Sequence, residues 1–403
     1  MFRPEHDWKN VMQAIKRSNE VDVIRMMALL GICVVNIHFM ALPVEEVFAK
    51  PASAADKMAA FLVECLFQLK FFLLFSFIFG WGMAIQQRSS QAQKRLTDPA
   101  PELPNQPPSF ARRYFRRMAG LALLGAAHAI LVFSGDILLL YALLGCLLWL
   151  IKDFTVPRLL QVAGWMVPLS MLCLTLLAVL FADMANPKLP LPGVIGSEAS
   201  GLGGSFIAAT QLRIADWPAT LGILLLLQGP LAFAAFAAGL AAAKTDFFAH
   251  GSSGYRWLGK RCPLLLAIAL PLNAWYAAVM GGLIAPSNEW LSLGGLVLAA
   301  VAAPALSLVY LWLFIWVARV ITVPQLLVWA GKNTLSCYVL QGVIAGWVFG
   351  GYGLGLFGHF GQWMLLWLAL GIALVSMLLV GLYAGKFSRG PLEQLLRRMS
   401  GYF

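Results

Sequence analysis

Charged side chains are scarce in this sequence. Only 12% of its 403 residues are Asp, Glu, Lys or Arg, whereas 60% are hydrophobic. A soluble globular domain usually carries about 25% charged residues. The composition therefore excludes a soluble protein and predicts an all-α, polytopic integral membrane protein.

Cysteine and histidine are also scarce, with six and five residues. The cysteines form no CxxC pair and have no histidine at ligand spacing. Most of them lie in apolar runs, where cysteine packs as a small hydrophobic residue. We therefore predict neither a disulfide framework nor a metal site. Serine-hydrolase and nucleotide-binding motifs are missing too, because the glycines near 201–204 and 350–361 lack the strand–turn–helix setting of a phosphate loop.

Acidic residues are fewer than basic ones, 18 against 29, which gives a net charge of +11. In a soluble protein this excess would suggest nucleic acid as a partner. Here the predicted spans put 24 of the 29 basic residues on one side, four on the other, and Lys70 within a span. This asymmetry follows the positive-inside rule, so the basic side is predicted to be cytoplasmic and no nucleic acid is needed to explain the charge.

Long apolar runs recur along the whole chain. About 20 residues cross a bilayer as a helix, and we expect about ten such spans. They lie at roughly 21–43, 59–85, two within 112–149, 159–182, 217–243, 263–285, 291–318, from 332 onward, and 362–384. An even number of spans places both the N- and C-termini in the cytoplasm.

No domain boundary is visible, so residues 1–403 are predicted to form a single transmembrane helical domain. The charged N-terminus is unlike a secretory signal, which predicts that the first span is an uncleaved anchor. The segments expected outside the membrane are a cytoplasmic interfacial lead-in at 1–20, a cytoplasmic loop at 86–112, a periplasmic loop at 183–215 and a cytoplasmic amphipathic tail at 386–403. The tail is predicted to contain an amphipathic helix that starts at Pro391. The periplasmic loop is either a lid over the membrane core or a tolerated insertion.

The hairpin between Arg112 and Trp149 contains the polar groups that hydrocarbon tolerates least. His128 lies within its first helix and Asp136 in its turn. A neutral imidazole can accept a proton from a hydroxyl or amine, and Asp136 or Glu64 can fix its tautomer. Alternatively, His128 only bonds a carbonyl across a helix interface, and Asp136 only caps the next helix. The sequence leaves both roles open for each residue.

Further polar residues are predicted to meet His128 in one pocket in the outer half of the membrane. Lys70 and Asn36 are expected among these polar groups, although a buried Lys70 could instead serve structural pairing with a counter-ion. The candidates for binding the substrate are Glu64, Gln68, His38, Asn333, Tyr338 and Gln341. The pocket requires that side chains from the first three or four spans converge in one water-accessible chamber.

Three arginines near the cytoplasmic ends of predicted spans form a separate group. Arg25, Arg116 and Arg117 either anchor their helices at the membrane interface or bind the phosphates of a cofactor such as coenzyme A. The sequence leaves this choice open.

Five ordered blocks carry a resemblance to a known family. They are VDVIRMMALLGICVVNI, FQLKFFLLFSFIFGWG, RRMAGLALLGAAHAILVFSGDILLLYALLG, AGKNTLSCYVLQ and SRGPLEQLLRR, and together they cover essentially the whole chain. They resemble the YeiB-type bacterial inner-membrane family, long catalogued as a domain of unknown function. This resemblance implies a multi-pass protein of the bacterial inner membrane.

That family is similar to the wider group of ten-helix transmembrane acyltransferases, which includes acyltransferase-3 proteins and heparan-α-glucosaminide N-acetyltransferase. The resemblance implies acyl transfer from a cytoplasmic acyl-coenzyme A to a membrane or periplasmic acceptor, with no metal. The implied partners are membrane lipids and a small-molecule or lipid-linked acceptor, and an oligomer is compatible with the sequence.

The first span departs from the acyltransferase-3 pattern. Those proteins place a catalytic histidine eleven residues after an arginine, and the same count from Arg25 reaches Asn36. An amide cannot act as a base, so His128, or else His38, would take over. The resemblance then implies that Lys70 and Asn36 are polar groups near the transferred acyl carbonyl. The alternative function is a transporter or a lipid- or small-molecule-binding protein whose Lys70 attracts an anionic substrate. Glycine-broken helices suit that class, whereas no internal repeat is evident.

Overall fold

The computed structural model describes residues 19–97, 109–184, 201–284 and 289–401, and every regular element within these ranges is a helix. Six of the helices are long and apolar enough to cross a membrane, or seven if one bent pair counts as a single span. The predicted all-α, multi-pass membrane architecture is therefore confirmed. The count of ten spans and the cytoplasmic position of both termini stay predictions.

The helices are α2 (Asn19–Ala41), α3 (Val44–Phe48), α4 (Ala54–Leu62), the π-helix η1 (Val63–Phe67), α5 (Phe71–Thr97), α6 (Phe110–Leu131), α7 (Leu138–Ile151), α8 (Val156–Met184), α10 (Phe206–Leu227), α11 (Gly229–Lys244), α12 (Ser253–Met280), α13 (Glu289–Val320), α14 (Gln325–Lys332), α15 (Thr334–Phe349), α16 (Gln362–Phe387) and α17 (Pro391–Met399).

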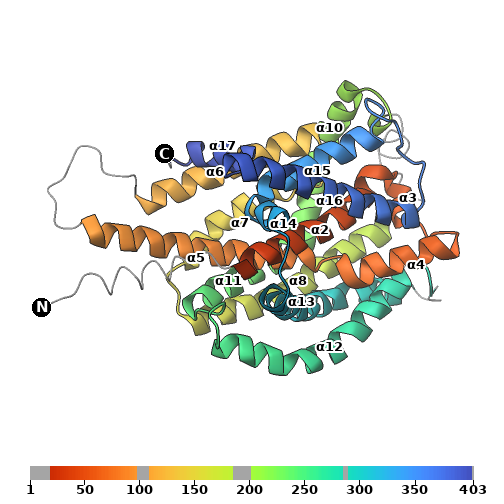
Figure 1. Ribbon diagram of the computed structural model, residues 1–403. Coiled ribbons are helices and arrows are strands. Elements are labelled where there is room, and N and C mark those ends of the chain that lie inside the picture. Colours follow the sequence, from red (N-terminus) through yellow and green to blue (C-terminus); the bar gives the residue numbers. More distant parts are fainter. Residues whose placement is uncertain (1–18, 98–108, 185–200, 285–288, 402–403) are drawn as a thin grey trace, which may run out of the picture.

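Most of the helices run side by side in one bundle, with α2 near its middle (Figure 1). α2 contacts α5, α13, α14, α15 and α16, and buried residues occur along its whole length. A helix that is apolar on every side needs such surroundings. Because α2 carries Arg25, Asn36 and His38, its central position places these side chains among other helices.

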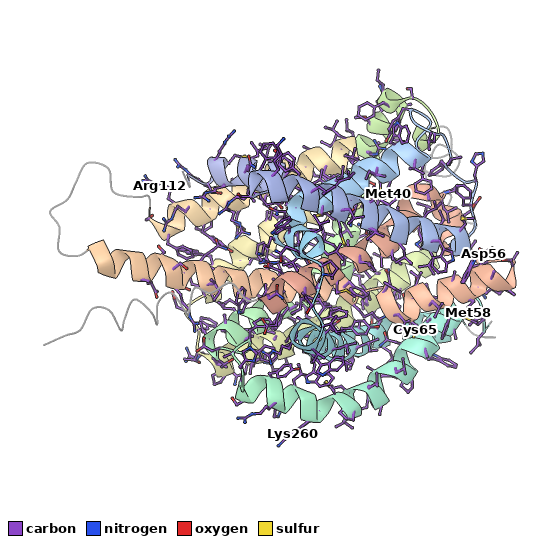
Figure 2. All side chains as sticks on the ribbon, in the orientation of Figure 1. Met40, Asp56, Met58, Cys65, Arg112 and Lys260 are labelled. Carbon is purple, nitrogen blue, oxygen red and sulfur yellow. The ribbon has the colours of Figure 1, made fainter. Side chains whose placement is uncertain are left out.

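The two ends of the bundle are used below as reference points. Arg112, near the start of α6, lies at one end, and Asp56 of α4 lies at the other (Figure 2). We call the first the basic end, because the arginine-rich start of α6 lies there. We call the opposite end the hairpin end, because α6 turns into α7 on that side.

The predicted hairpin of α6 and α7 is observed. α6 ends at Leu131 and α7 begins at Leu138, which brackets the predicted turn. Gly125 allows the close approach of the two helices, since a Cβ there would lie 2.5 Å from the backbone nitrogen of Leu139. The apolar runs and the turn residues between them were sufficient to locate this element.

The predicted span at 59–85 lies within one candidate membrane span, Ala54–Ala92, but its helix is interrupted between η1 and α5. Gln68 leaves the helical conformation, and Leu69 adopts a φ of 62°. Such a break inside a membrane protein requires partners for the released backbone groups. Ser307 of α13 donates to the Lys70 carbonyl at 3.1 Å, and Tyr310 donates to the Leu66 carbonyl at 3.1 Å. Tertiary contacts therefore stabilise a break that the apolar run conceals.

Two predicted loops are shorter than expected. In the segment predicted as a loop at 86–112, α5 continues to Thr97 and α6 begins at Phe110. Residues 98–108 lie outside the described residues. Likewise, α10 begins at Phe206, within the loop predicted at 183–215, of which residues 185–200 are not described. The Ser205 hydroxyl accepts from the Ala208 nitrogen at 3.2 Å and caps α10. A serine N-cap is a common local signal for a helix start.

The predicted span at 217–243 also differs, because α10 and α11 meet at Gln228 with a bend of 53°. Pro230 stands at the start of α11, where a proline is favoured because its missing N–H is not needed. The same signal marks the tail, since the predicted helix starting at Pro391 is observed as α17. Of the predicted lead-in at 1–20, residues 1–18 lie outside the described residues.

Candidate functional site

His128 and Asp136 form a buried pair in the hairpin of α6 and α7. The imidazole Nδ1 lies 2.9 Å from Asp136 Oδ1, and the two side chains are 3% and 0% exposed. The other carboxylate oxygen accepts from the Leu138 nitrogen at 2.8 Å. Asp136 thus makes the contacts that both of its predicted roles require, one with the imidazole and one with a free N–H group at the start of α7.

The hydrogen bond to Asp136 determines which ring nitrogen of His128 is available. A carboxylate beside Nδ1 favours the tautomer that carries its proton there, so Nε2 keeps a lone pair. Nε2 is buried and has no hydrogen-bond partner among the described residues. His128 therefore has the arrangement of a general base whose accepting atom is not consumed by a structural bond.

α15 covers the free side of the imidazole. A Cβ at Gly342 would lie 2.6 Å from His128 Nε2, so only glycine permits this approach without a shift. One turn earlier in α15, the Tyr338 ring lies 5.2 Å from the imidazole ring. Sequence reasoning named Tyr338 as a substrate-binding candidate and missed Gly342, for which the only signal was a small residue four positions after Tyr338.

A cavity of about 230 Å³ approaches this pair from the basic end of the bundle. Its inner wall includes Tyr338 and Tyr141, and its middle is lined by aliphatic and phenylalanine side chains. Its remaining polar residues are Arg25, Gln86, Arg117, Lys332, Thr334 and Glu393. The cavity thus joins a mouth with three cations to an apolar interior.

The structure separates the three predicted cofactor-binding arginines. Arg25 and Arg117 line the cavity, whereas Arg116 is exposed on the other side of α6. Arg25 also lies 3.4 Å from Asp22 in an ion pair. Sequence reasoning missed Lys332, which enters the cavity from the end of α14, and no periodic pattern at that position could have indicated it.

Glu393 of α17 is a second cavity residue that the sequence did not indicate. Its Oε1 accepts from the backbone nitrogens of Leu335 at 2.8 Å and Ser336 at 3.1 Å, and its Oε2 accepts from the Ser336 hydroxyl. These contacts bind the free N–H groups at the start of α15. α17 is thereby fixed across the cationic mouth.

Asn333 lies just before α15, and Gln341 lies within α15, three positions after Tyr338. The Asn333 side chain donates to the Trp329 carbonyl at 2.8 Å and accepts from the Gly390 nitrogen at 2.7 Å, so it joins α14 to the start of α17. Gln341 is buried, and neither atom of its amide has a partner among the described residues. Of the two, Gln341 keeps free polar atoms for a ligand.

Lys70, Glu64 and Gln68 form a different cluster at the break between η1 and α5. Lys70 is 1% exposed, and its Nζ donates to the Glu64 carbonyl at 2.7 Å. The Glu64 carboxylate pairs with the Tyr276 hydroxyl of α12. No described contact joins this cluster to His128, because η1 packs on α12, α4 and α2 whereas α6 packs on α7, α10 and α17.

Asn36 and His38 lie near the hairpin end of α2. His38 is buried, and its Nδ1 lies 3.0 Å from the Val34 carbonyl, which is an intrahelical contact. Asn36 is half-buried. No described contact brings either side chain to His128, so the proposed single chamber reduces to the His128 pair and the cavity beside it. In the described part of the chain, no three His, Cys, Asp or Glu side chains gather as a metal site would require.

Comparison with known proteins supports the family suggested by the sequence blocks. Residues 242–402 match a family described as "Protein of unknown function (DUF418)". The chain is 28% identical to "Uncharacterized protein YxaH" of Bacillus subtilis (strain 168), over 95% of this chain and 94% of that protein. It is 26% identical to "Uncharacterized protein YeiB" of Escherichia coli (strain K12), over 96% and 97%. These matches confirm the resemblance to the YeiB-type family. No solved structure matches the chain.

The match to the DUF418 family falls mainly on the wall opposite His128. The matched residues 242–402 include α15 and α17, which contribute Tyr338, Gly342 and Glu393. The His128 pair lies outside the family match but within the full-length alignments to the two YeiB-type relatives. The candidate site is therefore assembled from both halves of the chain.

Proposed function

We propose that this chain is a transmembrane acyltransferase-like protein of the bacterial inner membrane. It transfers an acyl group from a cytoplasmic acyl-coenzyme A to a membrane or periplasmic acceptor. One observation carries the proposal: the free Nε2 of His128 lies behind Tyr338, and Tyr338 lines a cavity whose mouth holds Arg25, Arg117 and Lys332.

The cavity suits the two chemical parts of an acyl-coenzyme A. Guanidinium groups bind phosphate oxygens through paired N–H donors, and lysine adds a point charge. Arg117 and Lys332 stand where the phosphates would remain at the mouth, while the apolar middle would hold the acyl arm. The volume of about 230 Å³ accommodates only part of such a ligand, so its nucleotide would stay outside the membrane.

The proposed chemistry needs one proton acceptor and no metal. His128 Nε2 removes the proton from the acceptor hydroxyl or amine while that atom bonds to the acyl carbon. The thioester C–S bond breaks, and the imidazolium returns the proton to the departing sulfur. Asp136 orients the ring throughout and stabilises its charged form, which is the usual role of a carboxylate behind a catalytic histidine.

Tyr338 determines access to the base. It lines the cavity, whereas His128 does not, so a thioester reaches Nε2 only when the Tyr338 side chain turns aside. The Tyr338 hydroxyl is buried and lies beside the Asp136 carboxylate and the Ile137 backbone.

The direct test is acyl-group release from a panel of acyl-coenzyme A thioesters. Purified protein in lipid nanodiscs is incubated with each thioester, and free thiol is measured with and without membrane-lipid acceptors. His128→Gln should lower the rate by about 10²–10⁴-fold, which is the usual contribution of a positioned base. His250→Gln, a change at an exposed loop histidine, should retain the rate. Absence of release from every thioester, or equal rates for both variants, would refute the proposal.

A separate observation favours the alternative, a transporter or a lipid- or small-molecule-binding protein. The break at 68–70 places Lys70 and Glu64 in the bundle interior, and discontinuous helices with buried charges are typical of transport sites. Uptake of an anionic solute into proteoliposomes that is lost in Lys70→Met, and that persists in His128→Gln without coenzyme A, would establish this function instead.

A further inference from the structure

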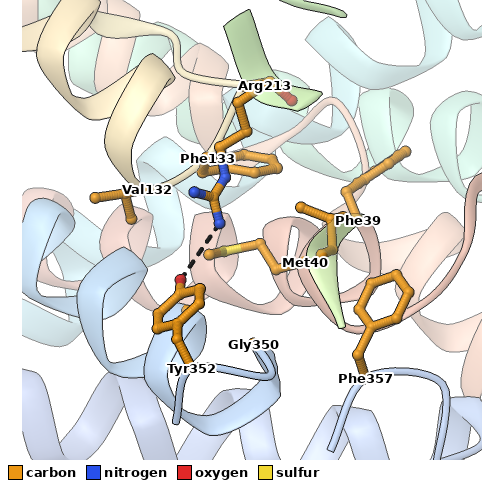
Figure 3. Close-up of a pocket in the computed structure, with 11 residues that line it drawn as sticks. Phe39, Met40, Val132, Phe133, Arg213, Gly350, Tyr352 and Phe357 are labelled. Atoms are coloured by element: carbon orange, nitrogen blue, oxygen red, sulfur yellow. Dashed lines mark hydrogen bonds between the residues drawn. The ribbon is translucent and has the colours of Figure 1, made fainter. Parts of the chain in front are cut away.

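A second, smaller pocket lies at the hairpin end of the bundle, and Arg213 of α10 points into it (Figure 3). The pocket measures about 30 Å³ and is lined by the α6–α7 turn, by α2 and by the loop after α15. Arg213 is only 5% exposed. A buried guanidinium is costly in a membrane protein unless its charge has a partner or a purpose.

Among the described residues, Arg213 contacts only neutral groups. Its Nη1 donates to the Leu131 carbonyl at 3.0 Å, and its Nη2 donates to the Tyr352 hydroxyl at 3.3 Å. No carboxylate among the described residues forms an ion pair with it, including Asp216 one turn further along α10. Capping the last turn of α6 explains the first contact. It does not explain why the second guanidinium nitrogen is directed into a pocket.

The two pockets lie on either side of His128 along one face of α15. Tyr338 lines the larger cavity, Gly342 contacts the imidazole, and Gly346 lines the Arg213 pocket. These residues are spaced by four, which places them on one face of a helix. Val132 also touches both Gly342 and the smaller pocket. The Arg213 pocket is therefore the approach to His128 from the hairpin end.

We propose that the Arg213 pocket binds an anionic group, a phosphate or a carboxylate, which enters by displacing the Tyr352 hydroxyl. The guanidinium then exchanges a weak neutral acceptor for a charged one, which forms the stronger hydrogen bond. If His128 is the acyl-transfer base, a point that rests on the proposed function, the bound anion belongs to the acceptor. The pocket itself does not depend on that chemistry.

The loop after α15 is built so that Tyr352 can act as a gate. Tyr352 packs edge-on against Phe206 of α10 at 5.2 Å and reaches Arg213 of the same helix. Gly351 passes so near the 201–204 segment that a Cβ there would lie 1.8 Å from the Gly203 carbonyl. The Tyr352 ring also lies against Gly346 and Gly350, and we infer that this half-buried side chain, and not a packed helix, moves when an anion enters.

Charge selectivity at residue 134 tests the site without any turnover. Ser134→Cys places a thiol on the pocket wall, in the full chain reconstituted in phosphatidylcholine nanodiscs. An anionic sulfonatoethyl methanethiosulfonate and a cationic trimethylammonioethyl methanethiosulfonate are reacted separately. Peptide mass spectrometry follows residue 134, so the six native cysteines do not interfere.

The anionic reagent should react faster than the cationic one. Adding Arg213→Gln should lower the anionic-to-cationic rate ratio by about tenfold, because a buried charge a few ångströms away dominates the local potential. Arg213→Lys keeps the charge and should keep most of the ratio. It also provides a comparison if the Arg213→Gln variant fails to fold. A ratio unchanged in Arg213→Gln, or lost equally in Arg213→Lys, would overturn the proposal.

Inorganic phosphate at constant ionic strength is the ligand probe. It should slow the anionic reagent at residue 134, and the slowing should disappear with Arg213→Gln. Adding phosphatidylglycerol to the discs instead tests a lipid head group as the source of the anion. Protection of residue 134 by phosphate or by phosphatidylglycerol would support the anion site and identify the source of the anion. If neither protects residue 134, the proposal is overturned. Tyr352→Phe removes the competing hydroxyl, so it should strengthen the protection, and unchanged protection would refute the gate.

Discussion

Gly342 of α15 lies directly against the imidazole of His128, so that a Cβ on Gly342 would stand 2.6 Å from Nε2. We expect Gly342→Ala to push the ring away from Asp136 and to lower acyl-group release by more than tenfold, because a misplaced base loses its near-attack geometry. Gly371→Ala on α16 is the matched control, since nothing lies within 4 Å of its added methyl group. Thermal unfolding of both variants would separate displacement from unfolding, and full activity in Gly342→Ala would contradict the placement of the base.

Asp136→Asn should retain the fold and lose most of the activity. The amide can still accept from the Leu138 nitrogen, but it no longer favours a proton on His128 Nδ1. We expect a rate loss of about 10²–10⁴-fold together with a stability loss near 1 kcal/mol or less, as for a partly kept helix cap. The measurements are thioester turnover and the midpoint of thermal unfolding. If turnover fell only in proportion to the folded fraction, Asp136 would be a capping residue and nothing more.

Arg117 and Arg116 offer a matched pair, since they are neighbours on α6 and only Arg117 lines the cavity. Arg117→Gln should raise KM for an acyl-coenzyme A by about tenfold with little change in kcat, because a phosphate contact at the mouth acts equally on the bound ground state and transition state. Arg116→Gln should leave KM unchanged. Equal effects of both substitutions would assign the arginines to interfacial anchoring.

Lys70 and Glu64 should show strong coupling in a double-mutant cycle of stability. Lys70→Met leaves the buried Glu64 carbonyl without its donor and the nearby carboxylate without a cation, which should cost about 3–5 kcal/mol. Adding Glu64→Gln should recover part of that loss, because no uncompensated charge then remains. The free energies come from unfolding in mixed detergent.

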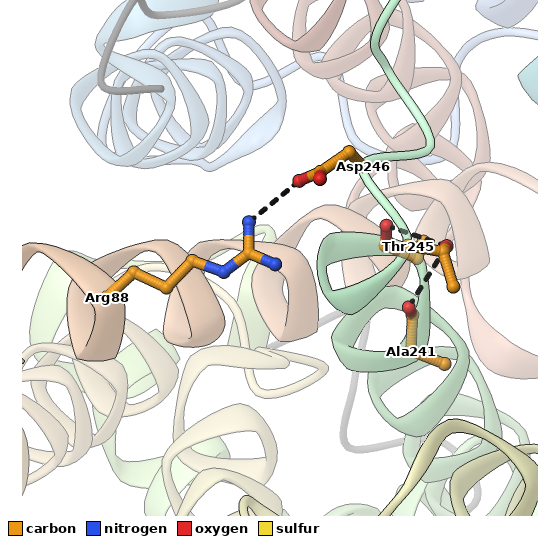
Figure 4. Close-up of polar contacts among 5 residues, drawn as sticks. Arg88, Ala241, Thr245 and Asp246 are labelled. Carbon is orange, nitrogen blue, oxygen red and sulfur yellow. Dashed lines mark hydrogen bonds and ion pairs between the residues drawn. The ribbon is translucent and has the colours of Figure 1, made fainter. Parts of the chain in front are cut away.

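An exposed ion pair provides the control for that cycle. Arg88 donates to Asp246 at 2.8 Å, with side chains 45% and 71% exposed (Figure 4). Arg88→Met should therefore change stability by less than about 1 kcal/mol. If the Lys70 and Arg88 substitutions cost the same, Lys70 would not carry the buried charge interaction described here.

Glu393→Ala should loosen α17 from the bundle. The carboxylate binds two backbone N–H groups and a hydroxyl at the start of α15, and loss of a helix cap costs about 0.5–2 kcal/mol. Hydrogen exchange should rise at Leu335, Ser336 and along α17, whereas Gln394→Ala, whose side chain bonds only within its own segment, should not raise it. Unchanged exchange after Glu393→Ala would show that apolar packing alone holds α17.

The sequence by itself determined the features that depend on local composition. The scarcity of charge and the length of the apolar runs identified a helical membrane protein, because hydrocarbon requires backbone groups to be satisfied within each segment. The turn residues between the α6 and α7 runs located that hairpin, and Pro391 located the start of α17. His128 and Asp136 could be paired because they lie eight positions apart on one hairpin.

Tertiary structure alone decided how distant segments meet. The break at Leu69 is stabilised by carbonyl contacts from α13, so an apolar run could not reveal it. The separation of Lys70 from His128, and the positions of Lys332, Gly342 and Arg213 around the two pockets, follow from which helices pack together. Hydrophobic periodicity shows that a helix face is apolar, but it does not show which helix packs against that face. Lipid tails and apolar side chains both favour the same residue types, so the sequence cannot distinguish them.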